Sequence, residues 1–151
     1  MAGETTFRLV APDDDIRIDV QPMQRIDGFG VERWDSGKWR ELIMQSDWCE
    51  QAIRDGRTMA IAGWTRLWDG VVHAYASLSC DCGPSMIPLT RRIRKAMDDA
   101  EGVRRFQMSV RADFGPGIRW AKLLGFEPEG VLSKYGPDGA DHILYAKVYE
   151  R

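Results

Sequence analysis

Two changes of hydrophobic period between residues 58 and 111 constrain the fold more than any other feature of this sequence. The segments 58–64 (TMAIAGW) and 71–79 (VVHAYASLS) are almost continuously apolar and are joined through the turn signal Asp69-Gly70. From Ser85 the apolar residues recur at helical spacing, and residues 105–111 (RFQMSVR) alternate like a strand. The pattern predicts a hairpin buried on both faces, then an amphipathic helix that crosses over to a further strand.

The segments before this hairpin predict two strands and two helices. Residues 7–10 (FRLV) are a short strand candidate, and residues 16–20 alternate apolar and polar side chains as in a half-buried strand. Ser36 can cap one helix. Ser46 can cap another, which we expect over residues 47–55.

The last part of the chain predicts a short helix and a closing hairpin. The helix opens near Pro116, a residue suited to a first turn, and ends at Gly125. Residues 126–132 (FEPEGVL) and 142–150 (HILYAKVYE) are strand candidates, separated by the turn sequence GPDG. The whole order predicts an α+β fold, in which about four helices flank a twisted, mostly antiparallel central sheet with at least one crossover.

Length and composition fit a single domain over residues 1–151. The formal net charge of −2 gives no general attraction to nucleic acids or anionic membranes. The odd number of cysteines, three, favours a reducing compartment, and the C-x-C spacing of Cys80 and Cys82 lacks a second ligand pair, so we expect no metal. Without a signal-like start or a long apolar run, we expect a cytoplasmic protein that does not enter membranes.

One motif resembles a known family. The pattern LGF-x-x-EG-V, placed after a short helix and before a terminal hairpin, resembles the GCN5-related N-acetyltransferase (GNAT) superfamily, as does the order of elements. The matching residues are Ile118, Arg119, Ala121, Leu124, Gly125, Phe126, Glu129, Gly130 and Val131. These residues are similar to the late helix and strand of the GNAT branch that acetylates ribosomal-protein N-termini. The resemblance implies a GNAT-like fold and acetyl-CoA as cofactor.

A second resemblance rests on arrangement. An apolar hairpin leads directly into a basic helix, and an "IR" helix and a GPDG hairpin follow. This layout is similar to that of short GNAT-like proteins encoded by short-tailed phages and described as internal virion proteins. It implies protein partners, including virion components, and assembly into a phage particle in the host cytoplasm.

Acyl transfer from CoA needs a cradle for the pyrophosphate, a donor for the thioester carbonyl and groups that move protons. In the superfamily the cradle is Q/R-x-x-G-x-G/A between a strand and a helix, where glycines let the backbone approach and the helix start adds amide donors. The corresponding stretch is residues 77–86 (SLSCDCGPSM). The candidate cofactor-binding residues are Ser79, Cys80, Cys82, Gly83, Ser85, Arg91 and Arg92.

This stretch departs from the family pattern. Gly83 is its only glycine, Pro84 has no N–H to donate, and Asp81 brings a negative charge to the place of the phosphates. Many members carry a Tyr four residues before the Gly of GF to protonate the leaving thiolate; Ala121 stands there instead. The sequence therefore leaves acetyl-CoA binding open.

The catalytic candidates are Asp81 and Tyr135. Asp81 follows a central strand, where clefts open in sheet folds, and it is otherwise a solvated loop residue. Tyr135 stands before the hairpin turn, where it can equally serve as a cross-strand aromatic. His73, within an apolar strand, is typical of a hydrogen-bonded core histidine, and we expect His142 to be exposed.

Three functions remain open. The altered cradle, the missing Tyr and the six Trp favour a GNAT-fold protein with a degenerate acyl-CoA site, acting in a virion, in assembly or in binding with little or no catalysis. The alternative is an active acetyl-CoA-dependent N-acetyltransferase on a protein N-terminus or small amine, with Asp81 or water as base. A nucleic-acid module built on the basic run 91–95 is least favoured, because the chain is net acidic.

Overall fold

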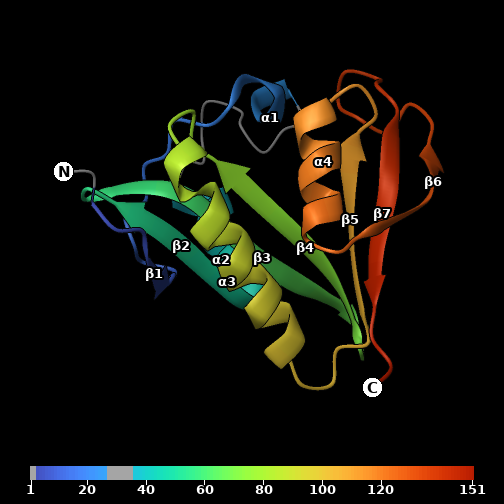
Figure 1. Cartoon of the computed structure of the whole chain (residues 1–151), viewed down its shortest axis with the longest axis horizontal. Coiled ribbons are helices and arrows are strands. Elements are labelled where there is room, and N and C mark those ends of the chain that lie inside the picture. The colour runs from blue at the N-terminus through green and yellow to red at the C-terminus, as the bar shows by residue number, and fades with distance from the viewer. Residues whose placement is uncertain (1–2, 27–35) are drawn as a thin grey trace. The chain divides into compact units, whose positions relative to one another are not determined.

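The described residues form a seven-stranded sheet with four α-helices, in the strand order β1-β2-β3-β4-β5-β7-β6 (Figure 1). The computed structural model describes residues 3–26 and 36–151. In chain order the elements are β1 (Thr6–Leu9), α1 (Pro22–Ile26), α2 (Ser36–Gln45), β2 (Ser46–Arg54), β3 (Arg57–Trp68), β4 (Val71–Leu78), the 3₁₀ turn η1 (Gly83–Ser85), α3 (Met86–Asp99), β5 (Arg105–Arg111), α4 (Gly115–Leu123), β6 (Glu127–Leu132) and β7 (His142–Val148). The predicted α+β class and the mixed sheet are confirmed.

Strand directions follow from the connections. β1–β2, β2–β3, β5–β7 and β6–β7 pair antiparallel, whereas β4 and β5 pair parallel. The parallel pair requires a crossover, and α3 supplies it, as the hydrophobic period predicts. The apolar side of α3 is buried at Leu89, Ile93 and Met97, while Arg91 and Arg94 are exposed.

The chain divides into two compact units. The first comprises residues 1–65 and 75–89, and the second comprises residues 66–74 and 90–151, so β3 and β4 each contribute residues to both. This division does not decide how many domains the chain has, so the single domain expected over residues 1–151 stays a prediction. The core of the first unit gathers around Tyr75, whose hydroxyl lies 2.8 Å from Ser46 Oγ. The buried members of this cluster are Val10, Ile43, Cys49, Ile61 and Tyr75.

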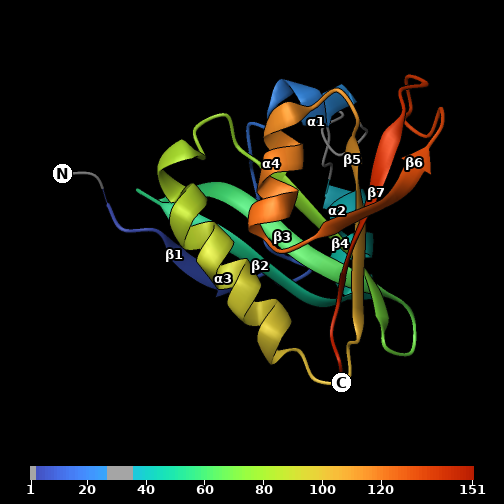
Figure 2. The ribbon, with the colours of Figure 1, turned by 45° about the vertical axis from the view of Figure 1, so that its right-hand side comes forward.

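The second unit is built on the strands β5, β7 and β6, which lie side by side (Figures 1 and 2). Phe106 in β5 and Tyr145 in β7 are almost fully buried. The C-terminal Arg151 donates hydrogen bonds to the carbonyl oxygens of Met97, Asp98 and Val103, where α3 ends. These bonds tie the end of the chain to the last turn of α3 and to Val103, the residue that precedes β5 by two positions.

The segment 47–55, predicted as a helix, is the strand β2 instead. Ala52 illustrates why: it pairs with Phe7 of β1 on one edge and with Ala60 of β3 on the other. Apolar residues four apart, such as Trp48 and Ala52, suit a helix or a strand equally. The two neighbouring strands decide between them, because they satisfy the backbone groups on both edges.

The segment 16–20, predicted as a strand, forms only a single bridge, between Val20 and Ser79. Its side chains do alternate between more and less exposed positions from Ile16 to Val20, as the sequence pattern predicts. An alternating pattern describes an extended chain, but a strand also needs a partner along its length. From the sequence we also expect Gly28 and Gly30 to loosen the chain after this segment, and both glycines lie outside the described residues.

Candidate functional site

The turn that follows β4 contains most of the candidate cofactor residues. Ser79 organises it: the Ser79 N–H donates to Met59 O (2.8 Å), the carbonyl accepts from the Cys82 N–H (3.1 Å), and the hydroxyl accepts from the Asp81 N–H (3.1 Å). All three polar groups of Ser79 make hydrogen bonds, and the residue is 1% exposed. Buried hydrogen bonds therefore hold the turn in place.

Most backbone amides of this turn already have acceptors in the protein. The Cys80 N–H donates to Asp19 O, the Ser85 N–H to Cys82 O, and the Met86 N–H to Gly83 O. Within the described residues, Gly83 is the position of the turn whose amide has no acceptor, and it is exposed. Since proline has no N–H, the backbone here offers an incoming phosphate one donor before α3 begins.

Two arginines that the sequence analysis missed lie beside the turn. Arg57 Nη2 is 3.2 Å from an Asp81 carboxylate oxygen, and Arg54 Nη1 donates to Pro84 O at 3.5 Å. They flank the β2–β3 hairpin turn, in which Asp55 has φ 51° and the following glycine φ 72°. The sequence Arg-Asp-Gly-Arg signals this hairpin turn but does not say which loop the arginines reach.

Three of the predicted cofactor residues are buried: Ser79, described above, Ser85 and Cys82. The Ser85 side chain is 0% exposed, and its Oγ lies 2.9 Å from Thr5 Oγ1. Cys82 is also 0% exposed, and burial raises the pKa of its thiol to about 11, so it is a neutral thiol at physiological pH. Their part in a cofactor site stays a prediction. Of the predicted cofactor residues in the turn, Cys80 and Gly83 are exposed.

The other candidate residues lie in the second unit. Arg91 and Arg92 are on α3, with Arg91 exposed and Arg92 half-buried. Tyr135 is exposed in the β6–β7 loop, and its ring packs edge-on against His142 with 5.2 Å between ring centres. The predicted exposure of His142 is wrong: it is 5% exposed, because Tyr135 and Gly136 of the β6–β7 loop lie against its ring.

Of the catalytic candidates, Asp81 belongs to the first unit and Tyr135 to the second. The Asp81 side chain is 59% exposed and forms an ion pair with Arg57. His73 of β4 is half-buried, and burial lowers its pKa, so its ring is neutral at physiological pH. The catalytic roles of Asp81 and Tyr135 stay predictions.

The pairing between β4 and β5 ends early. It covers Val71–Arg105, Val72–Phe106 and His73–Gln107, although β4 continues to Leu78 and β5 to Arg111. We refer to the backbone of residues 74–78, on the side facing away from β3, as the β4 edge. In the described part of the chain, β5 does not hydrogen-bond along the β4 edge.

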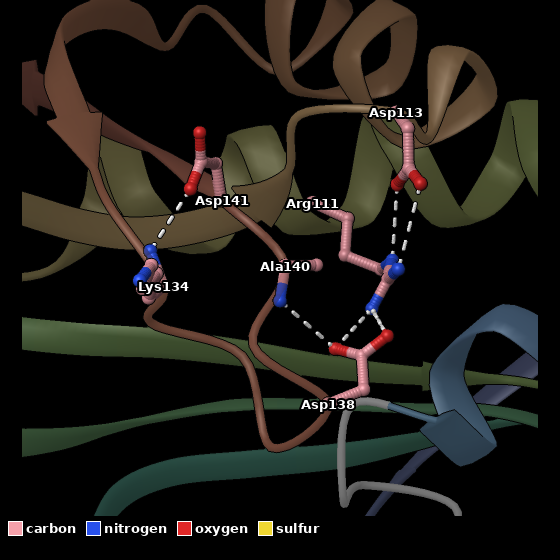
Figure 3. Close-up of polar contacts among 6 residues, drawn as sticks. All are labelled: Arg111, Asp113, Lys134, Asp138, Ala140 and Asp141. Carbon is pink, nitrogen blue, oxygen red and sulfur yellow. Dashed lines mark hydrogen bonds and ion pairs between the residues drawn. The ribbon is translucent and has the colours of Figure 1, made fainter.

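A buried arginine in the second unit holds the β6–β7 loop (Figure 3). Arg111, 6% exposed at its side chain, donates from Nη1 to both carboxylate oxygens of Asp138 (2.8 and 2.9 Å) and from Nε to Asp113 (3.0 Å). Asp138 also accepts from the Ala140 N–H, and these contacts lower its pKa. Asp141 accepts from the Lys134 N–H, so both ends of the loop are tied (Figure 3).

Over residues 3–26 and 36–151, no three or more His, Cys, Asp or Glu side chains gather as a metal site would require. None of the helices described there has the length and apolar character needed to cross a membrane.

Comparison with solved structures shows which class of proteins has this fold. No family model and no curated protein matches the sequence. The ribosomal-protein-S5-alanine acetyltransferase from Vibrio fischeri matches in structure at 19% identity and a TM-score of 0.68, covering 99% of this chain and 97% of its own. The acetyltransferase of the GNAT family from Streptococcus pneumoniae matches at 16% identity and a TM-score of 0.71, covering 97% and 100%.

YncA from Salmonella typhimurium, solved with its cofactor acetyl-CoA, matches at 15% identity and a TM-score of 0.71, covering 97% of this chain and 95% of its own. At these identities the likeness shows the fold. The chain therefore has the fold of the GNAT acetyltransferases, as the LGF-x-x-EG-V motif predicts. None of these three structures is a virion protein, and the phage-type resemblance stays a prediction.

Proposed function

We propose that this chain binds acetyl-CoA and transfers the acetyl group to an amine, either a protein N-terminus or a small molecule. The observation that carries the proposal is the β4 edge, which β5 leaves without a strand partner and which runs directly into the turn before α3. An extended chain with amide groups can add to such an edge as a further strand. The pantetheine arm of CoA is a chain of this kind.

The turn after β4 supports weak binding of the phosphates. The Gly83 amide, the start of α3 and the guanidinium groups of Arg54 and Arg57 are the groups that favour an anion. Asp81 opposes it, although Arg57 offsets that charge. One free amide is fewer than a glycine-rich cradle supplies, so we expect a dissociation constant of roughly 10–100 μM.

The reaction forms a C–N bond to the acceptor and breaks the thioester C–S bond. The amine loses one proton, and the departing thiolate gains one. Asp81 is exposed and held by Arg57, so we assign both proton transfers to solvent water. The acetyltransferase fold of the structural neighbours favours this activity over the virion-associated role with little or no catalysis, which none of the three structures described above supports.

Isothermal titration with acetyl-CoA, combined with a free-thiol assay using amine-terminated peptides and small amines, tests the proposal. The wild type should bind and release CoA thiol. Arg57→Ala should weaken binding about 5-fold, since it removes a cation and exposes the Asp81 charge, whereas Arg17→Ala, an exposed arginine of the same unit, should not. Pro84→Gly adds an amide donor and should tighten binding. The proposal is wrong if neither wild type nor Pro84→Gly binds at about 1 mM acetyl-CoA.

A further inference from the structure

In the described part of the chain, the side chain of Gln24 lies against the β4 edge. Gln24 of α1 donates from Nε2 to Ala76 O at 2.7 Å, and its Oε1 accepts from the Leu78 N–H at 2.7 Å. Both bonds belong to the same carboxamide, which therefore contacts the strand at two points, as the backbone of a neighbouring strand would. The backbone partners also fix the orientation of the carboxamide, because Ala76 O only accepts and the Leu78 N–H only donates.

The direction of the backbone groups shows which edge this is. The Ser79 N–H donates to Met59 O of β3, and successive amides of a strand point to opposite edges. Leu78 therefore directs its N–H and C=O away from β3, where its carbonyl accepts from the Gln21 N–H at 2.9 Å. Gln21 and Gln24 thus cover the end of the β4 edge, one through its backbone and one through its side chain.

The carboxamide and an amide of the pantetheine arm need the same partners. The Leu78 N–H can donate fully to one acceptor at a time, and a second amide at Ala76 O would overlap the Gln24 group. We propose that Gln24 is a plug on the β4 edge: it holds Ala76 and Leu78 in the ligand-free protein and must withdraw before the arm of acetyl-CoA can pair with β4. This inference rests on the proposed function.

Withdrawal requires little rearrangement. Gln24 is half-buried and lies in a helix of five residues, so its side chain can rotate away from the strand while the Gln21 backbone bond stays. Until a ligand arrives, the plug satisfies two backbone groups that would otherwise be exposed as an unpaired strand edge. The protein therefore lowers its own apparent affinity in proportion to the fraction of plugged molecules.

Gln24→Ala is the variant that tests the plug, and Gln21→Ala is its matched control, since the bond of Gln21 to β4 comes from the backbone. Titration with acetyl-CoA and with pantetheine, which carries the amides without the nucleotide, should show about 10-fold tighter binding for Gln24→Ala. Gln21→Ala should bind as the wild type does. Equal affinities for Gln24→Ala and wild type would overturn the plug and leave the proposed function standing. Weaker binding by Gln24→Ala would also overturn it, since Gln24 would then belong to the ligand site.

A second measurement uses the wild type alone and does not depend on a variant that folds. The Gln24 side-chain NH₂ protons should exchange slowly with solvent in the ligand-free protein and at least about 10-fold faster at saturating acetyl-CoA, as followed by NMR. Binding without faster exchange would refute the plug but not the cofactor. Absence of binding by wild type and by Gln24→Ala would refute both proposals.

Discussion

Gly63 shows how tightly one residue of the first unit is constrained. A Cβ at this position of β3 would lie 2.5 Å from the Tyr75 hydroxyl and 2.6 Å from Trp48 O. The hydroxyl has little room to retreat, because it is hydrogen-bonded to Ser46 Oγ, which itself donates to Leu42 O at 2.6 Å. The absence of a side chain at this position therefore lets Tyr75 lie across the strand.

We predict that Gly63→Ala lowers the free energy of unfolding by about 1–3 kcal/mol, the usual cost of overpacking a well-packed site. Gly130→Ala is the control: it also lies in a strand, but nothing is within 4 Å of its added Cβ. That variant should change stability by less than about 0.5 kcal/mol. Urea unfolding of both variants measures the difference, and similar losses would contradict the crowding described at Gly63.

At the scale of an element, the β6–β7 hairpin depends on contacts outside its own strands. Its loop is tied to Arg111, which comes from β5, through the carboxylate of Asp138 (Figure 3). GPDG alone favours a turn through backbone angles. The ion pair adds a fixed position for the loop, because Arg111 Nη1 contacts both carboxylate oxygens of Asp138 while Nε is held by Asp113.

This ion pair should make the free energy of unfolding depend on pH in the acidic range. The Arg111 hydrogen bonds lower the pKa of Asp138 in the folded protein below its ordinary value of 3.8. A carboxyl whose pKa falls on folding stabilises the fold above its unfolded pKa, and the contribution is lost as the pH drops through the folded value. The free energy of unfolding should therefore fall more between about pH 5 and pH 2.5 in the wild type than in Asp138→Asn.

Urea unfolding at several pH values in that range measures how steeply the free energy of unfolding changes with pH in the wild type and in Asp138→Asn. Arg111→Met should reduce the acid dependence in the same way as Asp138→Asn, because either change removes the interaction that lowers the pKa. If Asp138→Asn keeps the full wild-type slope, the acid dependence comes from other carboxylates, and this ion pair does not supply it.

At the scale of the whole molecule, charge gives no general attraction to an anionic cofactor, because the formal net charge is −2. Any electrostatic contribution must come from local groups, and the turn after β4 has Arg54 and Arg57 beside it. Exposed charges of this kind are screened by salt over about 10 Å at 0.1 M.

We therefore predict that acetyl-CoA binding weakens several-fold when NaCl rises from about 50 mM to about 500 mM. The double variant Arg54→Ala/Arg57→Ala should bind more weakly at low salt and lose most of this dependence, since it lacks the nearby cations. Titrations at both salt concentrations provide the comparison. Parallel salt dependences in the two proteins would show that the phosphates are held elsewhere.

Much of the fold could be predicted from local pattern. Period and turn chemistry correctly predicted β3, β4, α3, β5, α4 and the closing hairpin, because each of these segments has a strong periodicity and clear ends. β2 was predicted as a helix, because its apolar spacing is ambiguous and neighbouring strands decide the outcome. The burial of His142 was missed for a related reason, since the folded β6–β7 loop covers its ring.

The sequence by itself determined the order of elements from β3 to the closing hairpin, the α+β class and the resemblance to GNAT acetyltransferases, because these depend on side-chain periodicity and on turn residues close together in the chain. Only the tertiary structure decided which polar groups meet: Arg57 with Asp81, Arg111 with Asp138, and Gln24 with Ala76 and Leu78. Each of these contacts joins residues more than 20 positions apart, and no local pattern encodes such a contact, because it exists only once the sheet has brought the segments together.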